Sequence, residues 1–410
     1  MKALHIAFVG HVAGDDIQSL LAPGQAVASP GYAGAPLMGV LIGELLRQGH
    51  RVTAITSDST LPLDGGPQYR HGAGFSYVAT PARRRAWRPN GLRLGRAVDF
   101  FAFEIGQIAR AVDACAPDIV HAHWSYEMAL GAMRQDRPIL VTCHDSPRQV
   151  LRYSRNLYRS VRYLMARRVF AKGREFSAVS RYLADELRPY LAEAPEVIPN
   201  PVADYVFAAG AGPRQLPGTR RIGLICNGWG RRKNAEPALA AFARWRRSEP
   251  RAELHVYGDD FGPGERAQRW SLGRCLAAGM HFHGRLPHRA LVESLATMDA
   301  LLHPALEETF GVVLAEAMAL GLPVVAGRSS GAVPDVMAGD AQGRSPLGLL
   351  VDVSRVDDIV GGLDGVFDTQ YAARSRAGIE RAREHYSTAS VVRSYVDRYH
   401  RILAKESPCP

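Results

Sequence analysis

Apolar and polar positions follow one another along the first half of the chain in a pattern that predicts strands and helices in turn. Short apolar runs, typical of strands buried in a parallel sheet, are expected at 4–9, 52–56, 75–80, 118–123, 139–143, 175–180 and 196–199. Stretches with apolar residues three or four apart, typical of helices that bury one face, are expected at 37–48, 99–115 and 182–191. Strands that alternate with helices predict a parallel sheet with helices on its faces.

The same pattern repeats after a segment without periodicity. Residues 204–219 are rich in Gly, Pro and Ala and are predicted to form a linker. Beyond it, strands are expected at 222–226, 253–258, 281–284, 301–302, 323–326 and 348–352. Helices are expected at 236–247, 287–298, 312–320 and 391–404. We therefore predict an α/β protein with two Rossmann-like domains, residues 1–203 and 220–390, followed by a terminal segment, 391–410.

Composition agrees with a globular chain of two domains. The 410 residues are 47% hydrophobic and 22% charged, and a chain of this length is long for a single core. The five cysteines are scattered and lack C-x-x-C spacing, which indicates a reducing compartment and argues against a disulfide framework or a zinc site. The apolar run 3–10 is too short for a signal peptide, and no run is long enough for a transmembrane helix. We expect a cytoplasmic protein, attached at most to the inner face of a membrane.

The net charge of +10 suits partners such as nucleic acid, anionic lipid or phosphorylated small molecules, and does not choose among them. The most basic segment is 148–174, which is predicted to be one amphipathic helix. Its arginines are spaced three, four and three apart and are expected to form one stripe, consisting of Arg152, Arg155, Arg159 and Arg162. The stripe is interpreted as a site for anionic lipid, a site for a phosphorylated acceptor, or a solvated face. Nucleic acid is disfavoured because nothing else resembles a groove-reading module.

The stretch 301–326 carries the clearest chemistry. It is predicted to form a strand, a loop, a helix and a second strand, with Glu308 in the loop and Glu316 in the helix. The start of such a helix offers free backbone N–H groups to an anion, and a carboxylate accepts hydrogen bonds from neighbouring sugar hydroxyls. A ligand with a diphosphate and a sugar would suit this stretch. The alternative is that Glu308 only complements the helix dipole and Glu316 is an exposed helix residue.

Two further strand ends carry polar groups. The loop 227–234 places glycines, two arginines and a lysine before a helix, as a diphosphate requires: close approach, bidentate donors and a point charge. It lacks the spacing of a P-loop, which argues against an ATPase.

In the other predicted domain, His144 and Asp145 follow the strand 139–143, at the end where ligands bind in open α/β sheets. The glycines of the long loop 10–36, among them Gly34, allow close backbone approach to a ligand.

These motifs resemble those of retaining GT-B glycosyltransferases, specifically glycosyltransferase family 4. Glu308 and Glu316 match the two glutamates of its E-x7-E motif, with Phe310 and Gly311 between them. The resemblance implies that Glu308 contacts the donor sugar and that Glu316 contacts the ribose of the nucleotide. It also implies a GT-B fold of two Rossmann-like domains that face a cleft, with the terminal helix crossing back to the first domain.

The resemblance also implies roles for the other matched residues. Lys233 and one of the two loop arginines would hold the diphosphate, and Arg231 is preferred over Arg232. His144 would contact the donor sugar or the acceptor, and Asp145 would orient His144 or bind an acceptor hydroxyl. The remaining donor-binding residues that the resemblance implies are Gly34, Gly230, Asn234, Gly258, Arg285, Thr309, Phe310, Gly311 and Val312.

We therefore expect a retaining glycosyltransferase that moves a sugar from a nucleotide diphosphate sugar to a hydroxyl acceptor in glycan or glycoconjugate synthesis. A UDP-sugar is favoured as the donor and GDP-mannose comes next. The acceptor would be lipid-linked or phosphorylated if the basic helix is functional. The chain has no D-x-D motif, so neither a metal nor another cofactor is expected. Two alternatives stay open: a sugar-nucleotide epimerase on the same fold, and a non-catalytic nucleotide-sugar-binding protein.

Overall fold

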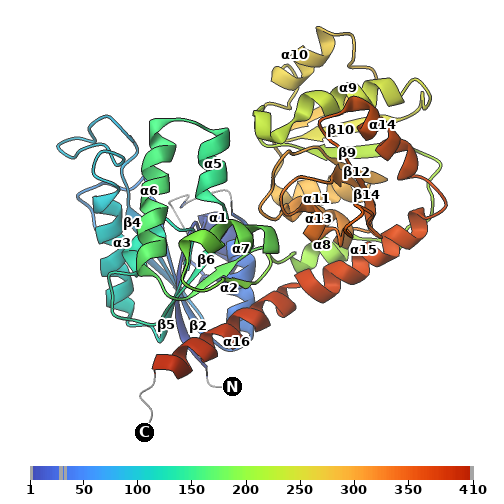
Figure 1. Ribbon diagram of the computed structural model, residues 1–410. Helices are drawn as coiled ribbons and strands as arrows, with labels where there is room; N and C mark the ends of the chain where they lie inside the picture. The colour runs from blue at the N-terminus through green and yellow to red at the C-terminus, as the bar shows by residue number, and fades with distance from the viewer. Residues whose placement is uncertain (1–2, 27–30, 32–34, 407–410) are drawn as a thin grey trace. The chain divides into compact units, whose positions relative to one another are not determined.

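The computed structural model describes residues 3–26, 31 and 35–406. The chain forms two compact units, which are described separately below: unit 1 comprises Met1–Pro201 with Thr388–Pro410, and unit 2 comprises Val202–Ser387 (Figure 1). Among the described residues, no helix combines the length and the apolar character needed to cross a bilayer.

Unit 1 is built on an eight-stranded sheet in the order β3-β4-β2-β1-β5-β6-β7-β8. Its strands are β1 (His5–Val9), β2 (Arg51–Asp58), β3 (Gln68–Gly72), β4 (Phe75–Pro81), β5 (Ile119–His123), β6 (Ile139–Cys143), β7 (Phe176–Ala178) and β8 (Glu196–Val197). All are parallel except β3, which pairs with β4 in antiparallel register. β3 was not predicted, because this edge strand has the polar sequence QYRHG.

The helices of unit 1 cover the two faces of this sheet (Figure 1). They are α1 (Gly14–Ile17), α2 (Leu37–Arg47), α3 (Ala102–Cys115), α4 (Glu127–Ala132), α5 (Pro147–Tyr153), α6 (Leu157–Lys172), α7 (Arg181–Leu187) and α16 (Thr388–Glu406). The last of these packs against α2. Its side chains share one apolar core with β1 and β2, since Tyr395 and Tyr399 cluster with Ile6, Phe8 and Val52. The final helix of the chain is thus part of the core of unit 1.

The prediction of a single basic helix over 148–174 is wrong. The structure has two helices, α5 and α6, with a break between them, because the side chain of Asn156 accepts a hydrogen bond from the backbone N–H of Arg159 at 2.9 Å and caps a new helix. Arg162 is buried, forms an ion pair with Glu127 and lies 3.8 Å from the centroid of the Tyr126 ring. The four arginines of the predicted stripe therefore do not form one exposed face.

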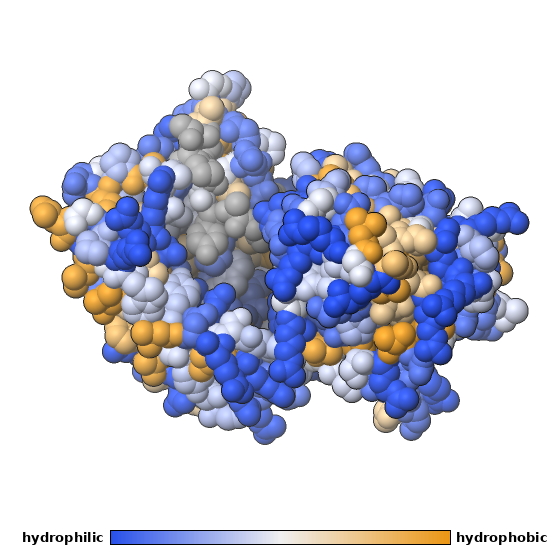
Figure 2. Space-filling model, turned by 90° about the horizontal axis from the view of Figure 1, so that it is seen from above, coloured by the Kyte–Doolittle hydropathy of each residue, from blue (hydrophilic) through white to orange (hydrophobic). Residues whose placement is uncertain are grey.

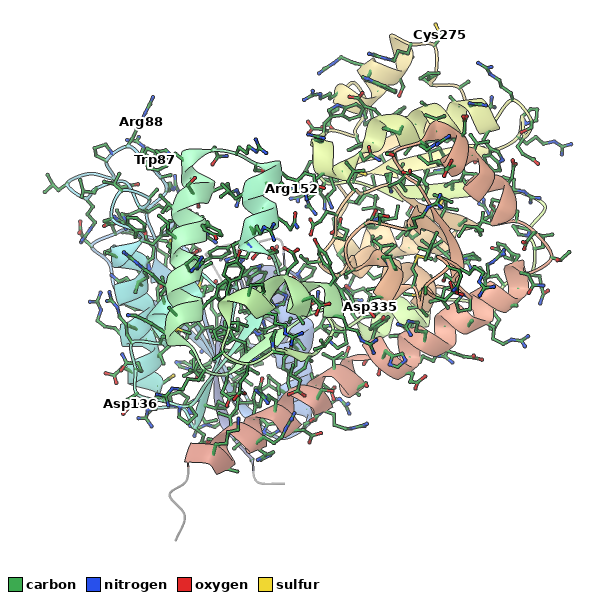
Figure 3. All side chains as sticks on the ribbon, viewed as in Figure 1. Trp87, Arg88, Asp136, Arg152, Cys275 and Asp335 are labelled. Carbon is green, nitrogen blue, oxygen red and sulfur yellow. The ribbon has the colours of Figure 1, made fainter. Side chains whose placement is uncertain are left out.

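A long loop connects β4 to α3 and is held at its root by a buried cation. The side chain of Arg83 is 1% exposed. Its guanidinium donates to Glu104 Oε2 at 2.7 Å and to Asp99 Oδ2 at 2.8 Å. The loop beyond it, residues 84–98, carries both apolar and charged side chains that are exposed. Trp87 and Arg88 project from it (Figure 3).

Unit 2 is built on a six-stranded sheet in the order β11-β10-β9-β12-β13-β14, with every strand pair parallel. Its strands are β9 (Arg221–Ile225), β10 (Glu253–Tyr257), β11 (Met280–Gly284), β12 (Ala300–His303), β13 (Val324–Gly327) and β14 (Gly348–Val351). All six predicted strands are confirmed. β9, β12, β13 and β14 are short, mostly buried apolar runs, as expected for a parallel sheet with helices on its faces. In β10 and β11, buried apolar residues alternate with more exposed polar ones.

The helices of unit 2 are α8 (Asp204–Ala209), α9 (Ala235–Trp245), α10 (Arg266–Leu272), α11 (His288–Ala296), α12 (Val312–Ala319), α13 (Val333–Val336), α14 (Val356–Gly365) and α15 (Tyr371–Tyr386). The segment 204–219 differs from the structureless linker that was predicted. It begins with α8, which packs on α11 and α12 and belongs to unit 2. Val206 is the buried anchor of this helix, and six residues are too few to give a periodic signal.

Candidate functional site

Two loops of unit 2 meet because the strands that precede them are neighbours. β9 pairs with β12, and both run in the same direction, so the loops that follow them leave from one edge of the sheet. The backbone N–H of Leu306 donates to the carbonyl of Arg232 at 2.8 Å and joins the two loops. The cations of the 227–234 loop and the carboxylate of the 304–311 loop are therefore brought together.

Glu308 is the counter-ion of two of these cations. Its Oε1 lies 2.6 Å from Lys233 Nζ, and its Oε2 lies 3.5 Å from a terminal nitrogen of Arg232. The same nitrogen donates to the carbonyl of Glu307 at 2.9 Å. Arg231 is exposed and lines a separate hollow with Trp229 and Glu236. Of the two candidate arginines, the structure brings Arg232 to Glu308, whereas the sequence analysis preferred Arg231.

The charges around Glu308 favour its ionised form. Burial alone would raise the pKa of Glu308, but Lys233, His303 and Arg232 together lower it below its usual range. Burial also lowers the pKa of His303 to about 4, so that this imidazole is uncharged at neutral pH. The site at rest is a half-buried carboxylate neutralised by two cations. It can exchange this internal pairing for contacts with an anionic ligand.

The loop continues into α12, whose start carries the other predicted donor-binding residues. Gly311 has a φ of 79°, the left-handed conformation that favours glycine. It allows the chain to turn into α12 directly after Phe310, whose ring is buried edge-to-face against Tyr386 with centroids 5.4 Å apart. Thr309 and Val312 are half-buried at this turn. Phe310 thus anchors the loop, and its neighbours Thr309, Gly311 and Val312 place their backbone at the start of α12.

Glu316 has a different set of partners from Glu308. It is buried, and its Oε1 lies 2.7 Å from Nε2 of His288, the first residue of α11. The Nδ1 of His288 in turn lies 2.5 Å from the hydroxyl of Tyr205 on α8. His288 and Tyr205 were missed because they are far from Glu316 in sequence, and only the packing of three helices brings them together.

Of four other predicted residues, Asn234 and Gly258 have structural roles, and Gly230 and Arg285 lie on the surface. Asn234 donates to the carbonyls of Pro304 and Val353, at 3.0 and 2.8 Å, and so ties three loops together. A Cβ atom at Gly258, where φ is 117°, would lie 1.8 Å from the carbonyl oxygen of Cys226, so only glycine fits there. Gly230 is exposed, and Arg285 pairs with Asp259 at 3.0 Å on the surface.

In unit 1, His144 and Asp145 lie just past the end of β6. The Nε2 of His144 lies 2.9 Å from Nδ1 of His123, and the His144 ring packs on Trp124 with centroids 4.5 Å apart. Burial lowers the pKa of His144 to about 3, so the imidazole is neutral. Asp145 accepts a hydrogen bond from the Tyr126 hydroxyl at 3.0 Å. Gly34 lies outside the described residues.

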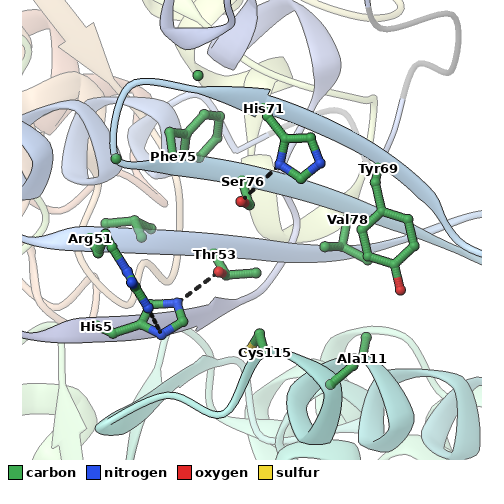
Figure 4. Close-up of a pocket in the computed structure, with 14 residues that line it drawn as sticks. His5, Arg51, Thr53, Tyr69, His71, Phe75, Ser76, Val78, Ala111 and Cys115 are labelled. Atoms are coloured by element: carbon green, nitrogen blue, oxygen red, sulfur yellow. Dashed lines mark hydrogen bonds between the residues drawn. The ribbon is translucent and has the colours of Figure 1, made fainter.

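Unit 1 also has a pocket of about 420 Å³, which lies away from these strand ends (Figure 4). It is lined by the first residues of β1 and β2, His5 and Arg51, together with Tyr69, His71 and side chains of α3. His5 bonds to Thr53 Oγ1 at 2.9 Å within it. The pocket therefore lies at the opposite ends of the parallel strands from His144, and it contains none of the predicted site residues.

Two family profiles match the chain in succession. The profile of glycosyltransferase family 4 matches residues 39–204, and the profile described as glycosyl transferases group 1 matches residues 213–385. The chain belongs to the group 1 glycosyltransferases. The second match covers the loops that carry Lys233 and Glu308 and the helix that carries Glu316 in this glycosyltransferase, and the first covers His144.

Individual relatives agree with this family. The glycosyltransferase is 39% identical to a sulfoquinovosyl transferase from Arabidopsis thaliana over 79 residues, which are 19% of this chain and 15% of the relative. It is 29% identical to a glycogen synthase from Mycobacterium tuberculosis over 285 residues, 65% of this chain and 64% of the relative. The matched segments thus span less than two thirds of each relative.

Solved structures of GT-B glycosyltransferases are similar to this chain in fold. A sucrose-phosphate synthase from Thermosynechococcus elongatus matches with a TM-score of 0.72 at 18% sequence identity, covering 98% of this chain and all of the other. This similarity confirms the predicted fold class, with two Rossmann-like units built on parallel sheets.

Proposed function

We propose that this glycosyltransferase is a retaining enzyme that transfers a sugar from a nucleotide diphosphate sugar to a hydroxyl acceptor. The observation that carries the proposal is the pairing of Glu308 with Lys233 and Arg232. A bound diphosphate would replace Glu308 as the partner of both cations, since phosphate oxygens are strong acceptors for lysine and arginine. The carboxylate released in this exchange would accept hydrogen bonds from the hydroxyls of the donor sugar.

The proposed chemistry depends on charge that grows on the leaving diphosphate. Lys233 and Arg232 stabilise this charge most strongly in the transition state, which is where an interaction accelerates the reaction. In the donor complex the carboxylate of Glu308 would be engaged by the hydroxyls of the donor sugar, so we propose attack from the same face of the sugar and not a covalent intermediate on Glu308. In such a step the leaving phosphate takes the proton of the acceptor hydroxyl. The two cations fill the role of a metal at the diphosphate, so we propose that transfer requires none.

The nucleotide part of the donor would be held by Glu316. Its carboxylate is fixed by His288, and its second oxygen is left to accept hydrogen bonds from the two hydroxyls of a ribose. The neutral imidazole of His144 suits a hydrogen bond to an uncharged sugar hydroxyl. A UDP-sugar is the donor that we would test first, followed by GDP-mannose.

Calorimetric titration with UDP, GDP and ADP tests the donor site directly. We expect one nucleotide to bind clearly more tightly than the others. Glu316→Ala should weaken that binding by about 1–3 kcal/mol, because hydrogen bonds to a charged group are lost. Glu384→Ala is the matched control, since this glutamate is 75% exposed on α15. If none of the three nucleotides binds to the wild-type chain, the proposed donor site is wrong.

We also propose that unit 1 can attach to an anionic membrane through the exposed loop 84–98. This loop has four large apolar side chains in contact with solvent, Trp87, Leu92, Leu94 and Val98, beside exposed arginines. Orange hydrophobic side chains stand among hydrophilic ones at the left margin of unit 1 (Figure 2). Apolar side chains flanked by cations suit the interface of an anionic bilayer. An acceptor linked to lipid would then lie within reach of the enzyme.

Co-sedimentation with anionic and neutral vesicles tests this attachment. Binding should be confined to the anionic vesicles and should fall as salt is raised, because the attraction is screened. Arg88→Ala and Leu92→Ala should each weaken it by about 1 kcal/mol or more. Arg134→Ala, an exposed arginine of unit 1 outside the loop, is the control and should have no effect. Equal binding to both kinds of vesicle would contradict the proposal.

A further inference from the structure

Imidazoles gather at one edge of the sheet of unit 2. Residues two apart on a strand share a face, so β10 presents Glu253 and His255 on the same side on which β11 presents His281 and His283. The two strands are parallel neighbours, and His255 lies directly opposite His281 in the register. The intervening residues Leu254 and Phe282 point into the core. The sheet therefore gathers three imidazoles and one carboxylate on one small surface.

Three of these groups are arranged as metal ligands would be. The Nε2 of His255 lies 3.3 Å from Oε2 of Glu253, and the Nε2 of His281 lies 4.0 Å from Oε1 of the same carboxylate. The three candidate ligand atoms all lie within 4.8 Å of one another. Around a tetrahedral zinc ion, ligand atoms about 2.0–2.2 Å from the metal lie roughly 3.3–3.6 Å apart. Small rotations of the exposed Glu253 and His281 side chains would close the remaining gap.

The fourth group of the cluster orients the most buried ligand. The Nε2 of His283 lies 3.0 Å from Nδ1 of His255, and the two rings are stacked at an interplanar angle of 6°. A histidine that binds a metal through one nitrogen is commonly fixed by a hydrogen bond at the other.

One charge opposes a cation at this surface. Arg221 is the register partner of Glu253 on β9, but its guanidinium is drawn toward Asp299, whose Oδ2 lies 3.9 Å from Nε. Its charge is therefore partly compensated away from the cluster. The donor loops leave from the other ends of the parallel strands, so the cluster is separate from the site around Glu308.

We propose that Glu253, His255 and His281 form a binding site for one divalent transition-metal ion, with His283 as the residue that positions His255. Two imidazoles and one carboxylate suit Zn²⁺, with water in the fourth position. The ion would join the edge strand β11 to β10. Because it binds the folded unit and not the unfolded chain, it would raise the unfolding temperature of unit 2.

Titration of the full chain with zinc chloride tests the site, after removal of any histidine tag and treatment with a chelator. We expect one zinc ion per chain by calorimetry and no binding of Mg²⁺, which prefers oxygen ligands. His281→Ala and Glu253→Gln should each weaken zinc binding at least about tenfold, and His283→Gln by about tenfold through the positioning of His255. Titration with Co²⁺ should give visible absorption bands of a tetrahedral complex, and both ligand variants should lose them.

His385→Ala is the matched control. His385 lies 3.7 Å from Glu384 in the same unit, so the variant removes one histidine of a histidine–glutamate pair that is not part of the cluster. It should bind zinc like the wild type. The two ligand variants alter side chains that are 44% and 47% exposed, and circular dichroism with chelator present would verify that they fold. Absence of stoichiometric zinc binding, or binding unchanged in both variants, would overturn the proposal. Nucleotide titration of the same samples is a separate readout, so the donor site and the metal site can fail independently.

Discussion

Replacement of Lys233 by alanine is expected to lower kcat about 10²–10³-fold, the usual cost of removing one donor that stabilises developing negative charge. The ammonium group lies 2.6 Å from Glu308, at the position where we propose that the diphosphate leaves. Because this charge grows in the transition state, kcat should fall more than KM rises. The measurement is release of the nucleoside diphosphate, with the donor chosen by calorimetry and an acceptor found by screening.

Arg231→Ala is the internal control for this prediction. It removes a neighbouring cation that lines a different hollow. The kcat of sugar transfer should therefore fall far less than in Lys233→Ala. The variant Lys233→Arg keeps the charge beside the half-buried Glu308 and separates loss of chemistry from loss of folding. Equal losses in Lys233→Ala and Arg231→Ala would contradict the assignment of the diphosphate site to Lys233 and Arg232.

Replacement of Arg83 by methionine is expected to lower the free energy of unfolding of unit 1 by about 3–5 kcal/mol, as when one partner of a buried ion pair is removed. The variant leaves the carboxylate of Glu104, whose side chain is 3% exposed, buried without its cation. Asp99 loses its partner as well. Urea unfolding followed by circular dichroism would measure the change.

Arg93→Met gives the matched comparison on the same loop. Its ion pair joins side chains that are 41% and 94% exposed, and exposed pairs contribute about 0–1 kcal/mol. A loss in Arg93→Met as large as that in Arg83→Met would show that the loop is stabilised by its charges in general and not by the buried network.

Much of the architecture could be predicted because apolar periodicity reports burial. The six strands of unit 2 bury apolar side chains, either in a continuous run or, as in β11, at every second residue, and each was expected within a residue or two of its place. Elements that bury little were missed, such as β3, whose sequence is polar, and α8, whose anchor is Val206. The break between α5 and α6 depends on a capping side chain, Asn156, and the spacing of the arginines carried no sign of it.

The candidate site was predictable where a motif fixes its spacing and unpredictable where packing decides. Glu308 and Lys233 were singled out from the sequence, and the structure brings them together. The choice between Arg231 and Arg232 depends on which side chain the short turn directs toward Glu308, and adjacent identical residues give no signal for that. Contacts such as Tyr205 with His288, 83 residues apart, form only when separate helices pack.

The place of α16 has a consequence for the order in which the chain can fold. The hydroxyl of Tyr399 bonds to Nδ1 of His121 at 2.6 Å across 278 residues of sequence, and this helix completes the core around β1 and β2. During synthesis the first 201 residues leave the ribosome long before this helix exists, with part of their apolar core still uncovered. Domains commonly fold as they emerge, N-terminal first. Here we expect the later-made unit 2 to reach its native state first, because the core of unit 1 stays incomplete until the last helix has been made.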